Sequence, residues 1–427
     1  MKPRLALLAA ALIVLVVAPP AHAEDETPTP TPTPTEDPVR AAEYWLDDYG
    51  ITDAWKTTKG KGVTVAVIDT GIADGPEEFD GAVVGGADVS GAGTEDGRTP
   101  VGAQDRDHGS YVASLLAGRG TGDDTGMIGV APEANLLSIS IGFGSSSSVP
   151  FTDQLASAMK QAVDLGADII NLSLTTNSLG WDESWDDAFL YAFDHDVLVV
   201  AAAGNRGSGT EVVGAPATIP GVLVVGGVDE KGVASVNAST QGITIGVMAP
   251  SEQLLGVSID GDTKTWNGTS GAAPIVSGIA ALIKSAHPEL SAADIIARIE
   301  GTAAQSEKAT STPDPIYGYG LIDAAAAVED DGPTATDDPA DELRDWIAVH
   351  RRADDDDPEP TQTSAPVSIP PIPPAEAPGE AGSPLAPSSE SLREVTIPLV
   401  AASAAGILIV LGAAAVFRRV RATRARR

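Results

Sequence analysis

The stretch Val63-Thr64-Val65-Ala66-Val67-Ile68-Asp69-Thr70-Gly71 decides the fold. Its first six residues form a short, nearly continuous apolar run, which is typical of a strand covered on both faces in a parallel sheet. Similar runs follow at residues 135–141, 167–174, 197–203 and 221–228. The sequence therefore predicts a mostly parallel sheet.

Helical patterns separate several of these runs. Residues 153–165 carry apolar side chains at helical spacing, including Leu155 and Met159, and residues 183–193 form a second such segment. Alternating strands and helices indicate an α/β domain with a doubly wound sheet and helices on both faces. Sheets of this kind place their functional groups at the carboxyl ends of the strands.

The composition excludes several classes of function. The formal net charge of −34 argues against nucleic-acid binding, which requires clustered Lys and Arg. We interpret the charge as a solubilising surface of an exported protein, and attraction of basic substrates is the alternative. The chain has no cysteine, which excludes disulfides, zinc–thiolate sites and cysteine nucleophiles.

The N-terminal segment has the features of an export signal. Met1–Arg4 is basic, residues 5–17 are apolar, and Ala21-His22-Ala23 is a small-x-small cleavage site. These features predict a secretory signal peptide cut after Ala23, with a retained membrane helix as the alternative. The alternating Thr and Pro of residues 27–35 then predict an extended spacer.

The C-terminal segment has the features of a membrane anchor. A Pro- and Asp-rich stretch predicts a disordered linker. The apolar segment after it is long enough to span a bilayer as one transmembrane helix, and a buried globular helix is the alternative. Arginines follow at once, so the positive-inside rule places the tail in the cytoplasm and the folded domain outside.

These boundaries predict a signal peptide, a spacer, a folded domain with an N-terminal extension, a linker, a membrane helix and a basic cytoplasmic tail. In chain order they are residues 1–23, 24–40, 41–329, 330–394, 395–417 and 418–427.

Elimination among the five histidines selects a candidate general base. His22 leaves with the signal peptide, and His195, His287 and His350 lie in a turn, just after a helix and in the linker. His108 remains, at the start of a predicted helix. An exposed histidine at a helix start is by itself an ordinary surface residue, so the other parts of a catalytic site must be found independently.

Those other parts lie at strand ends and helix starts. Hydrolysis by a serine nucleophile needs a base, an acid that orients it, and donors for the oxyanion. Asp69 directly follows a predicted strand, Asn205 follows another, and Ser270 opens a predicted helix. Each has a plainer explanation, because Asp and Asn are common in turns and Ser is a common helix cap. Gly109, next to His108, is predicted to let a partner chain approach.

Four motifs around these residues resemble the subtilase family of serine proteases. They are the aspartate, histidine, oxyanion and serine motifs, at Val67-Ile68-Asp69-Thr70-Gly71, His108-Gly109-Ser110-Tyr111-Val112-Ala113, Ala203-Gly204-Asn205 and Asn267-Gly268-Thr269-Ser270-Gly271-Ala272-Ala273-Pro274. Their order along the chain is the order known for subtilisin. The resemblance runs from about residue 55 to residue 327.

The resemblance implies a role for each residue. Ser270 attacks the peptide carbonyl, His108 takes and later returns the proton, and Asp69 orients the imidazole. Asn205 and the Ser270 backbone N–H stabilise the oxyanion.

A further segment resembles the family's substrate-binding strand, at Ser173, Leu174 and Thr175. Thr175 stands where the family usually has Gly, which predicts a narrower pocket. Gly271 stands where a larger apolar residue is usual, which predicts a looser helix start. No cofactor or metal is expected to be required; calcium stabilises many subtilases, but no ligand loop of clear spacing is present.

The whole layout resembles the mycosins, subtilases tied to type VII secretion in actinobacteria. Residues 43–55 resemble the mycosin extension that packs on the catalytic domain, although mycosins generally carry cysteines and this chain has none. The resemblance implies a membrane-anchored extracytoplasmic endopeptidase that acts on a protein or peptide and processes substrates of, or stabilises, a type VII secretion membrane complex. The alternatives are a free-standing cell-surface subtilase, a mainly structural scaffold, and an adhesin with a Pro-rich stalk.

Overall fold

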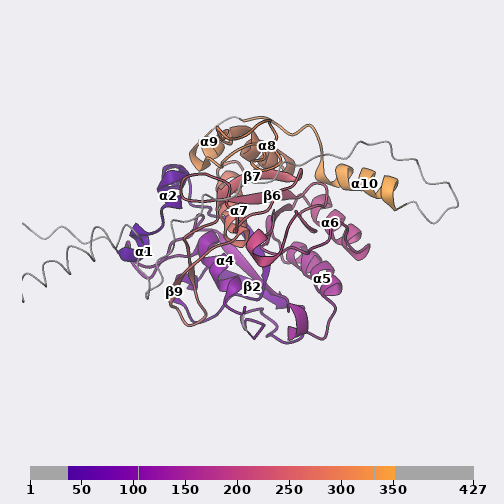
Figure 1. The fold of residues 1–427 in the computed structure, drawn as a ribbon. Helices are drawn as coiled ribbons and strands as arrows, with labels where there is room; N and C mark the ends of the chain where they lie inside the picture. The colour runs from indigo at the N-terminus through magenta and orange to yellow at the C-terminus, as the bar shows by residue number, and fades with distance from the viewer. Residues whose placement is uncertain (1–36, 104, 330–331, 352–427) are drawn as a thin grey trace, which may run out of the picture. The chain divides into compact units, whose positions relative to one another are not determined.

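The computed structural model describes residues 37–103, 105–329 and 332–351. These residues form an α/β domain built on one seven-stranded sheet (Figure 1). The predicted signal peptide and the apolar segment 395–417 lie outside this part of the chain and stay predictions. Within it, none of the helices has the length and apolar character needed to cross a membrane.

The seven strands are all parallel and run in the order β2-β3-β1-β4-β5-β6-β7. Their bounds are β1 Thr64–Asp69, β2 Val83–Asp88, β3 Asn135–Ser140, β4 Ile169–Leu172, β5 Leu198–Ala202, β6 Leu223–Val228 and β7 Ile245–Pro250. The five predicted strands are confirmed, and β2 and β7 are additional. The chain passes from β1 to β2 and β3 on one side and then crosses to β4 on the other, so β1 lies at the topological switch point.

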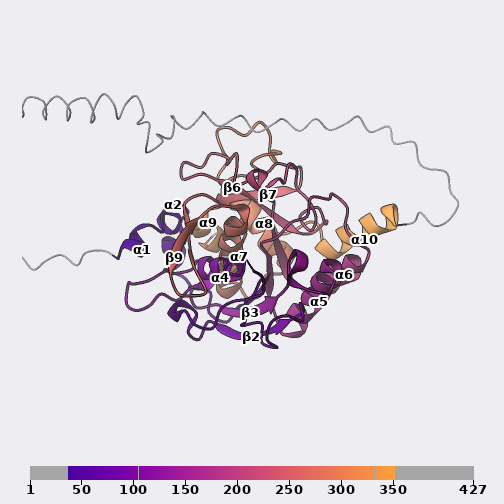
Figure 2. The ribbon, with the colours of Figure 1, turned by 60° about the horizontal axis from the view of Figure 1, so that its bottom comes forward.

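Helices cover both faces of the sheet (Figures 1 and 2). On one face α4 packs against α7, and on the other α5 packs against α6. An antiparallel pair of short strands, β8 and β9, precedes α7. Their bounds are α4 His108–Ala117, α5 Phe151–Asp164, α6 Ser184–Asp194, α7 Thr269–Ala286, α8 Ala292–Thr302, α9 Ala324–Glu329, β8 Leu254–Val257 and β9 Thr263–Trp266. Three short 3₁₀ helices are η1 Glu77–Phe79, η2 Gly144–Ser146 and η3 Arg206–Ser208.

The N-terminal extension packs on this domain, as the resemblance to mycosins implies. It consists of α1 Pro38–Ala41, α2 Trp45–Asp48 and α3 Ile51–Ala54. Trp45 and Ile51 are fully buried. The Trp55 indole donates to the carbonyl of Val130 at 2.7 Å, and the Tyr44 hydroxyl donates to the carbonyl of Glu252 at 2.9 Å. Apolar burial and directed hydrogen bonds therefore both fix the extension.

A carboxyl group is buried under the same extension. Glu43 Oε1 accepts a hydrogen bond from the backbone N–H of Ile128 at 2.9 Å, and Arg40 lies 3.8 Å from its other oxygen. Burial raises the pKa of Glu43 to about 8, despite these two favourable contacts.

The folded part extends beyond the predicted boundary at residue 329. Helix α10, Pro339–His350, lies against α6 (Figure 1), so the prediction of a disordered linker is wrong for these residues. Asp338 caps the helix by accepting from the N–H of Ala340 at 2.8 Å, Pro339 suits the first turn, and Leu343 is fully buried. Composition alone did not predict this helix, because the stretch that contains it is rich in Asp and Pro.

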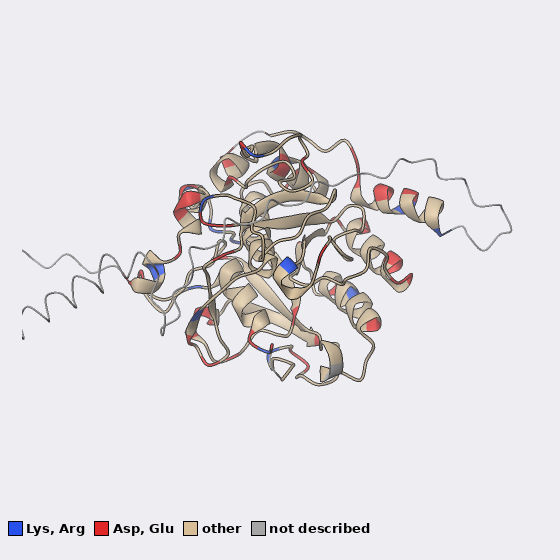
Figure 3. Ribbon diagram, viewed as in Figure 1, with Lys and Arg blue, Asp and Glu red and all other residues tan. Residues whose placement is uncertain are grey.

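Acidic side chains lie mostly on the outer helices and loops. Figure 3 shows Asp and Glu on α2, α6 and α10, while most of the sheet carries no charge. This distribution agrees with a solubilising surface.

Candidate active site

The predicted catalytic residues meet at one edge of the sheet. Asp69 ends β1, Ser173 follows β4 and Asn205 follows β5, and these strands are neighbours with their carboxyl ends together. His108 is the first residue of α4, and Ser270 is the second residue of α7. The site therefore lies at the topological switch point, where α/β sheets bind their ligands.

Asp69 and His108 form a directed pair. The imidazole Nδ1 lies 2.8 and 2.9 Å from the two carboxylate oxygens of Asp69, which is fully buried and also accepts from the N–H of Thr70 at 2.7 Å. The His108 side chain stays 28% exposed. Burial disfavours the charged imidazolium, but the charge and hydrogen bond of Asp69 outweigh it and raise the pKa of His108. Such a pair leaves Nε2 as the ring nitrogen that can accept a proton.

Glycines allow the close packing that holds this pair. A Cβ on Gly109 would lie 2.5 Å from the carbonyl oxygen of Gly71. Gly71 itself has φ +107°, and a Cβ there would lie 2.7 Å from the carbonyl oxygen of Gly97. The Thr70 hydroxyl accepts from the N–H of Gly109 at 2.9 Å. The loop after β1 therefore lies directly against the start of α4, and approach of a partner chain at Gly109 stays a prediction.

Ser270 and Ser173 hold each other through two reciprocal hydrogen bonds. The Ser270 hydroxyl donates to the carbonyl of Ser173 at 3.2 Å, and the Ser173 hydroxyl donates to the carbonyl of Ser270 at 2.8 Å. The second bond, from Ser173 to the carbonyl of Ser270, is explained by a proline in α7. Pro274 has no N–H, so it cannot bond the carbonyl four residues earlier, and Ser173 satisfies that carbonyl instead.

A buried polar chain extends from Ser173 into α7. The Asn171 amide donates to the Ser173 hydroxyl at 2.9 Å and accepts from the Ser277 hydroxyl at 3.0 Å. Asn171 and Ser277 are fully buried. The sequence did not predict these hydrogen bonds, because no local pattern indicates that Asn171 in a strand contacts Ser277 in a helix much further along the chain.

Asn205 is oriented by the residue before the candidate nucleophile. Its Oδ1 accepts from both the N–H and the hydroxyl of Thr269, at 2.8 and 3.0 Å, so its NH₂ group remains as a donor. The N–H of Ser270 has no acceptor within the helix, because it belongs to the first turn of α7. Gly268 has φ +149°, and a Cβ there would come within 3.0 Å of the Asn205 Nδ2.

The predicted substrate-binding strand lies beside this donor. Leu174 is buried, and the Thr175 hydroxyl lies within hydrogen-bonding distance of the carbonyls of Thr176, at 3.1 Å, and Gly214, at 3.3 Å. The Thr175 methyl group lies 3.0 Å from where a Cβ of Gly204 would sit, next to Asn205. A narrower pocket stays a prediction, and this methyl group is the atom that would narrow it.

Gly271 and Trp266 belong to one packed cluster behind His108. A Cβ on Gly271 would lie 2.4 Å from Leu254 and 3.3 Å from Trp266. Neighbouring side chains thus fill the space that a larger residue would need. The Trp266 ring also meets the His108 ring edge to face, with 5.7 Å between centroids. No sequence signal pointed to Trp266.

The other described histidines are tied to backbone carbonyls. A ring nitrogen of His195, His287 or His350 lies 2.7 to 2.9 Å from such an oxygen. In the described ranges, no group of three or more His, Asp or Glu side chains is placed to hold a metal ion. Independence from metals and cofactors stays a prediction.

A cavity of about 310 Å³ lies beside the acid–base pair. It is lined by Thr70, which directly follows Asp69, and by Asp105 and Phe143, among others.

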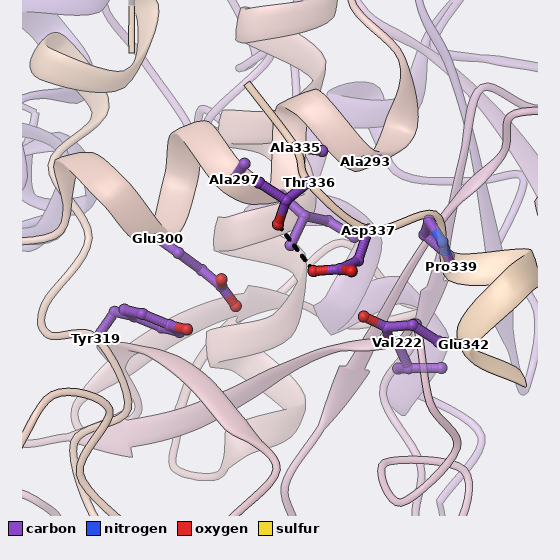
Figure 4. A pocket seen from close by; sticks show the side chains of 12 residues that line it. Val222, Ala293, Ala297, Glu300, Tyr319, Ala335, Thr336, Asp337, Pro339 and Glu342 are labelled. Carbon is purple, nitrogen blue, oxygen red and sulfur yellow. Dashed lines mark hydrogen bonds between the residues drawn. The ribbon is translucent and has the colours of Figure 1, made fainter. Parts of the chain in front are cut away.

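A second cavity, of about 340 Å³, lies at the opposite edge of the sheet, where Val222 precedes β6. Figure 4 shows the carboxylates of Glu300 and Glu342 entering it from two sides, with Tyr319 and Asp337 nearby. Burial and the charge of Glu342 raise the pKa of Glu300 to about 7. This acidic cavity is separate from the candidate active site.

Comparisons with known proteins agree with this geometry. A sequence profile described as the Subtilase family matches residues 60–320. Mycosin-4 of Mycobacterium tuberculosis is 34% identical over 336 residues, covering 68% of this chain and 70% of that protein. Subtilisin DY of Bacillus licheniformis is 37% identical over 279 residues, covering 64% of this chain and 92% of that protein.

The solved structures give the same result. A structure of the MycP3 protease from the type VII (ESX-3) secretion system matches with a TM-score of 0.56 at 32% identity, covering 67% of this chain and 88% of that one. The chain belongs to the Subtilase family and is a subtilisin-like serine protease.

Proposed function

We propose that the protein is a membrane-anchored extracytoplasmic serine endopeptidase that cleaves peptide bonds with Asp69, His108 and Ser270. The observation that carries this proposal is the Asp69–His108 hydrogen bond at 2.8 Å, formed at the sheet edge to which α7 brings Ser270. Asn205, oriented by Thr269, supplies the oxyanion donor.

The chemistry proceeds in two halves. The Ser270 hydroxyl turns from the carbonyl of Ser173 toward His108 Nε2, which takes its proton as Oγ bonds to the substrate carbonyl carbon. The Asn205 NH₂ group and the Ser270 N–H stabilise the oxyanion. The imidazolium then protonates the departing amine, which leaves an acyl-enzyme. Water attacks the ester with His108 again as base, and the acid product leaves.

We infer the setting from the termini and the relatives. The predicted helix at residues 395–417 would anchor the protease with its site outside the cell. Similarity to mycosin-4 and to the MycP3 protease supports action on a protein or peptide within or beside a type VII secretion complex. A free-standing surface protease would share the chemistry and lack this partner.

The test is hydrolysis of fluorescently labelled casein by the purified full-length chain and by Ser270→Ala. We expect Ser270→Ala to lower the rate by a factor on the order of 10⁶, as the corresponding loss does in subtilisin. Ser285→Ala, at the far end of the same helix, is the matched control and should hydrolyse like wild type. Equal hydrolysis by wild type and Ser270→Ala would contradict the proposal.

A further inference from the structure

The loop that joins β4 to α6 carries the predicted substrate-binding strand at its start. We call residues 173–181 the substrate-binding loop. The N–H of Thr176 donates to the carbonyl of Ala215, and the N–H of Ala215 donates to the carbonyl of Ser178, both at 2.8 Å. The loop therefore runs from Ser173, beside Ser270, along residues 214–215 to Trp181.

The end of this loop is held by the C-terminal helix. The rings of Trp181 and Trp346 of α10 lie 4.1 Å apart between centroids. The guanidinium of Arg351, directly after α10, lies 5.7 Å from the Trp181 ring centroid and 5.3 Å from that of Trp346. Arg351 also donates to the carbonyl of Trp181 at 3.1 Å. A cation over two aromatic faces that also hydrogen-bonds the backbone is a specific contact.

Asp186 of α6 completes this cluster. Its carboxylate accepts from the Trp181 indole at 2.6 Å and from Arg351 Nε at 2.9 Å. The Asp186 and Arg351 side chains are only 11% and 23% exposed. Little water reaches the pair, so its hydrogen bonds are stronger than those of a surface ion pair.

We propose that Arg351 is a positioning residue for the substrate-binding loop and that it acts on substrate affinity through its contacts with Trp181. This rests on the proposed function. Arg351 fixes the backbone of Trp181 at one end of the loop, and the Ser173–Ser270 pair fixes the other. The part between them, including Thr175, keeps its place against residues 214–215. Loss of Arg351 removes the hydrogen bond to the Trp181 carbonyl and the cation over its ring, so the far end of the loop is held less firmly. The acid–base pair is not part of this cluster.

The same helix supplies a matched control. Arg344 pairs with Asp194 of α6 and with Asp341 of α10. It holds α10 on α6 and has no contact with the loop among the described residues. Arg344→Ala therefore reports what weaker docking of the helix does by itself.

The experiment compares wild type, Arg351→Ala, Arg351→Lys and Arg344→Ala in the full-length chain. The substrates are tetrapeptide p-nitroanilides that differ only in the residue before the scissile bond. Arg351→Ala should raise KM several-fold with kcat within about twofold of wild type, and it should change the order of preference among the peptides. Arg351→Lys, which keeps the charge opposite Asp186, should recover part of the affinity. Arg344→Ala should behave like wild type.

Hydrogen exchange gives a readout that does not depend on activity. Amides of residues 174–181 should exchange faster in Arg351→Ala than in Arg344→Ala, with the amides of β1 and α4 unchanged. Unchanged exchange in the loop, an unchanged KM, or an equal effect of Arg344→Ala would overturn the inference. A wild type that cleaves no peptide contradicts the proposed function instead, and loop exchange then decides whether Arg351 positions the loop.

Discussion

The two sides of the candidate site are built differently. On the base side, Nδ1 of His108 already lies 2.8 Å from the Asp69 carboxylate, and backbone packing around Gly71 and Gly109 holds the pair in place. The nucleophile side, centred on Ser270, is held by side-chain hydrogen bonds to Ser173 and by the polar chain behind it. Steric fit between backbone segments sets the geometry of the base side. Hydrogen bonds whose partners the Ser270 hydroxyl can exchange set the geometry of the nucleophile side.

This difference shows which part of the site is already arranged for catalysis and which part must move first. The base side needs no movement before it can take a proton, because its tautomer and orientation are already fixed. The nucleophile side needs one rotation of the Ser270 hydroxyl, away from the carbonyl of Ser173. Changes to the base side should therefore cost more activity than changes to the polar chain that supports the nucleophile.

The largest expected effect on the base side is that of Asp69→Asn. The amide favours the wrong imidazole tautomer, so kcat should fall by a factor on the order of 10⁴. The pH profile should change as well. Catalysis needs neutral His108, whose pKa is raised above 6.5 by Asp69, so wild-type activity is lost as pH falls through that raised value. Asp69→Asn removes the negative charge and should move this acid limb to lower pH.

Steady-state rates measured between pH 5 and pH 9 check this prediction, because this range includes the pH values at which histidine changes its charge. Asp53→Asn, an exposed carboxylate paired with Lys56, is the control and should leave both rate and profile unchanged. An unshifted acid limb in Asp69→Asn would show that Asp69 does not set the pKa of His108.

A second change tests the steric basis of the base side. Gly109→Ala places a methyl group 2.5 Å from the carbonyl of Gly71, so α4 must move away from the loop after β1. A displacement of about 1 Å at a catalytic group can cost on the order of 10²-fold in rate, and overpacking costs about 1–3 kcal/mol of stability. Thermal melts and kcat/KM measure the two effects. Gly75→Ala, where a Cβ meets nothing closer than 3.8 Å, should change neither.

The smallest expected effect is on the nucleophile side. Ser277→Ala leaves the buried Oδ1 of Asn171 without its donor, which should cost about 1–3 kcal/mol of stability and less than about tenfold in kcat. Asn171→Ala should not add to it fully, because both changes break one chain. Denaturant unfolding of the single and double variants measures the coupling, with exposed Ser157→Ala as control. If the stability losses of the two single variants add fully in the double variant, the hydrogen bonds of Asn171 and Ser277 do not act as a unit.

Much of the fold could be predicted because continuous apolar runs report strands buried on both faces. β2 was missed because it is an edge strand with Gly85 and Gly86 in its centre, and β7 because Gly246 and Pro250 interrupt its pattern. Helix α10 was missed because its burial rests on few apolar side chains, chiefly Leu343, in an acidic stretch.

The residues of the candidate site also divide into those that the sequence predicts and those that it does not. Asp69, His108, Asn205 and Ser270 stand in local motifs at strand ends and helix starts, where sequence is informative. The contact between Ser277 and Asn171 depends on how α7 lies across β4, and no local pattern reports that packing. Trp266 beside His108 depends likewise on the placement of β9.

The central claim is that Ser270 is a nucleophile activated by His108. Labelling of the full-length chain with a fluorophosphonate probe tests it most directly, because the probe reacts only with an activated serine. We predict one labelled site, mapped to Ser270 by mass spectrometry, with labelling lost in Ser270→Ala and strongly slowed in His108→Ala. Labelling at another serine, or equal labelling without His108, would contradict the account.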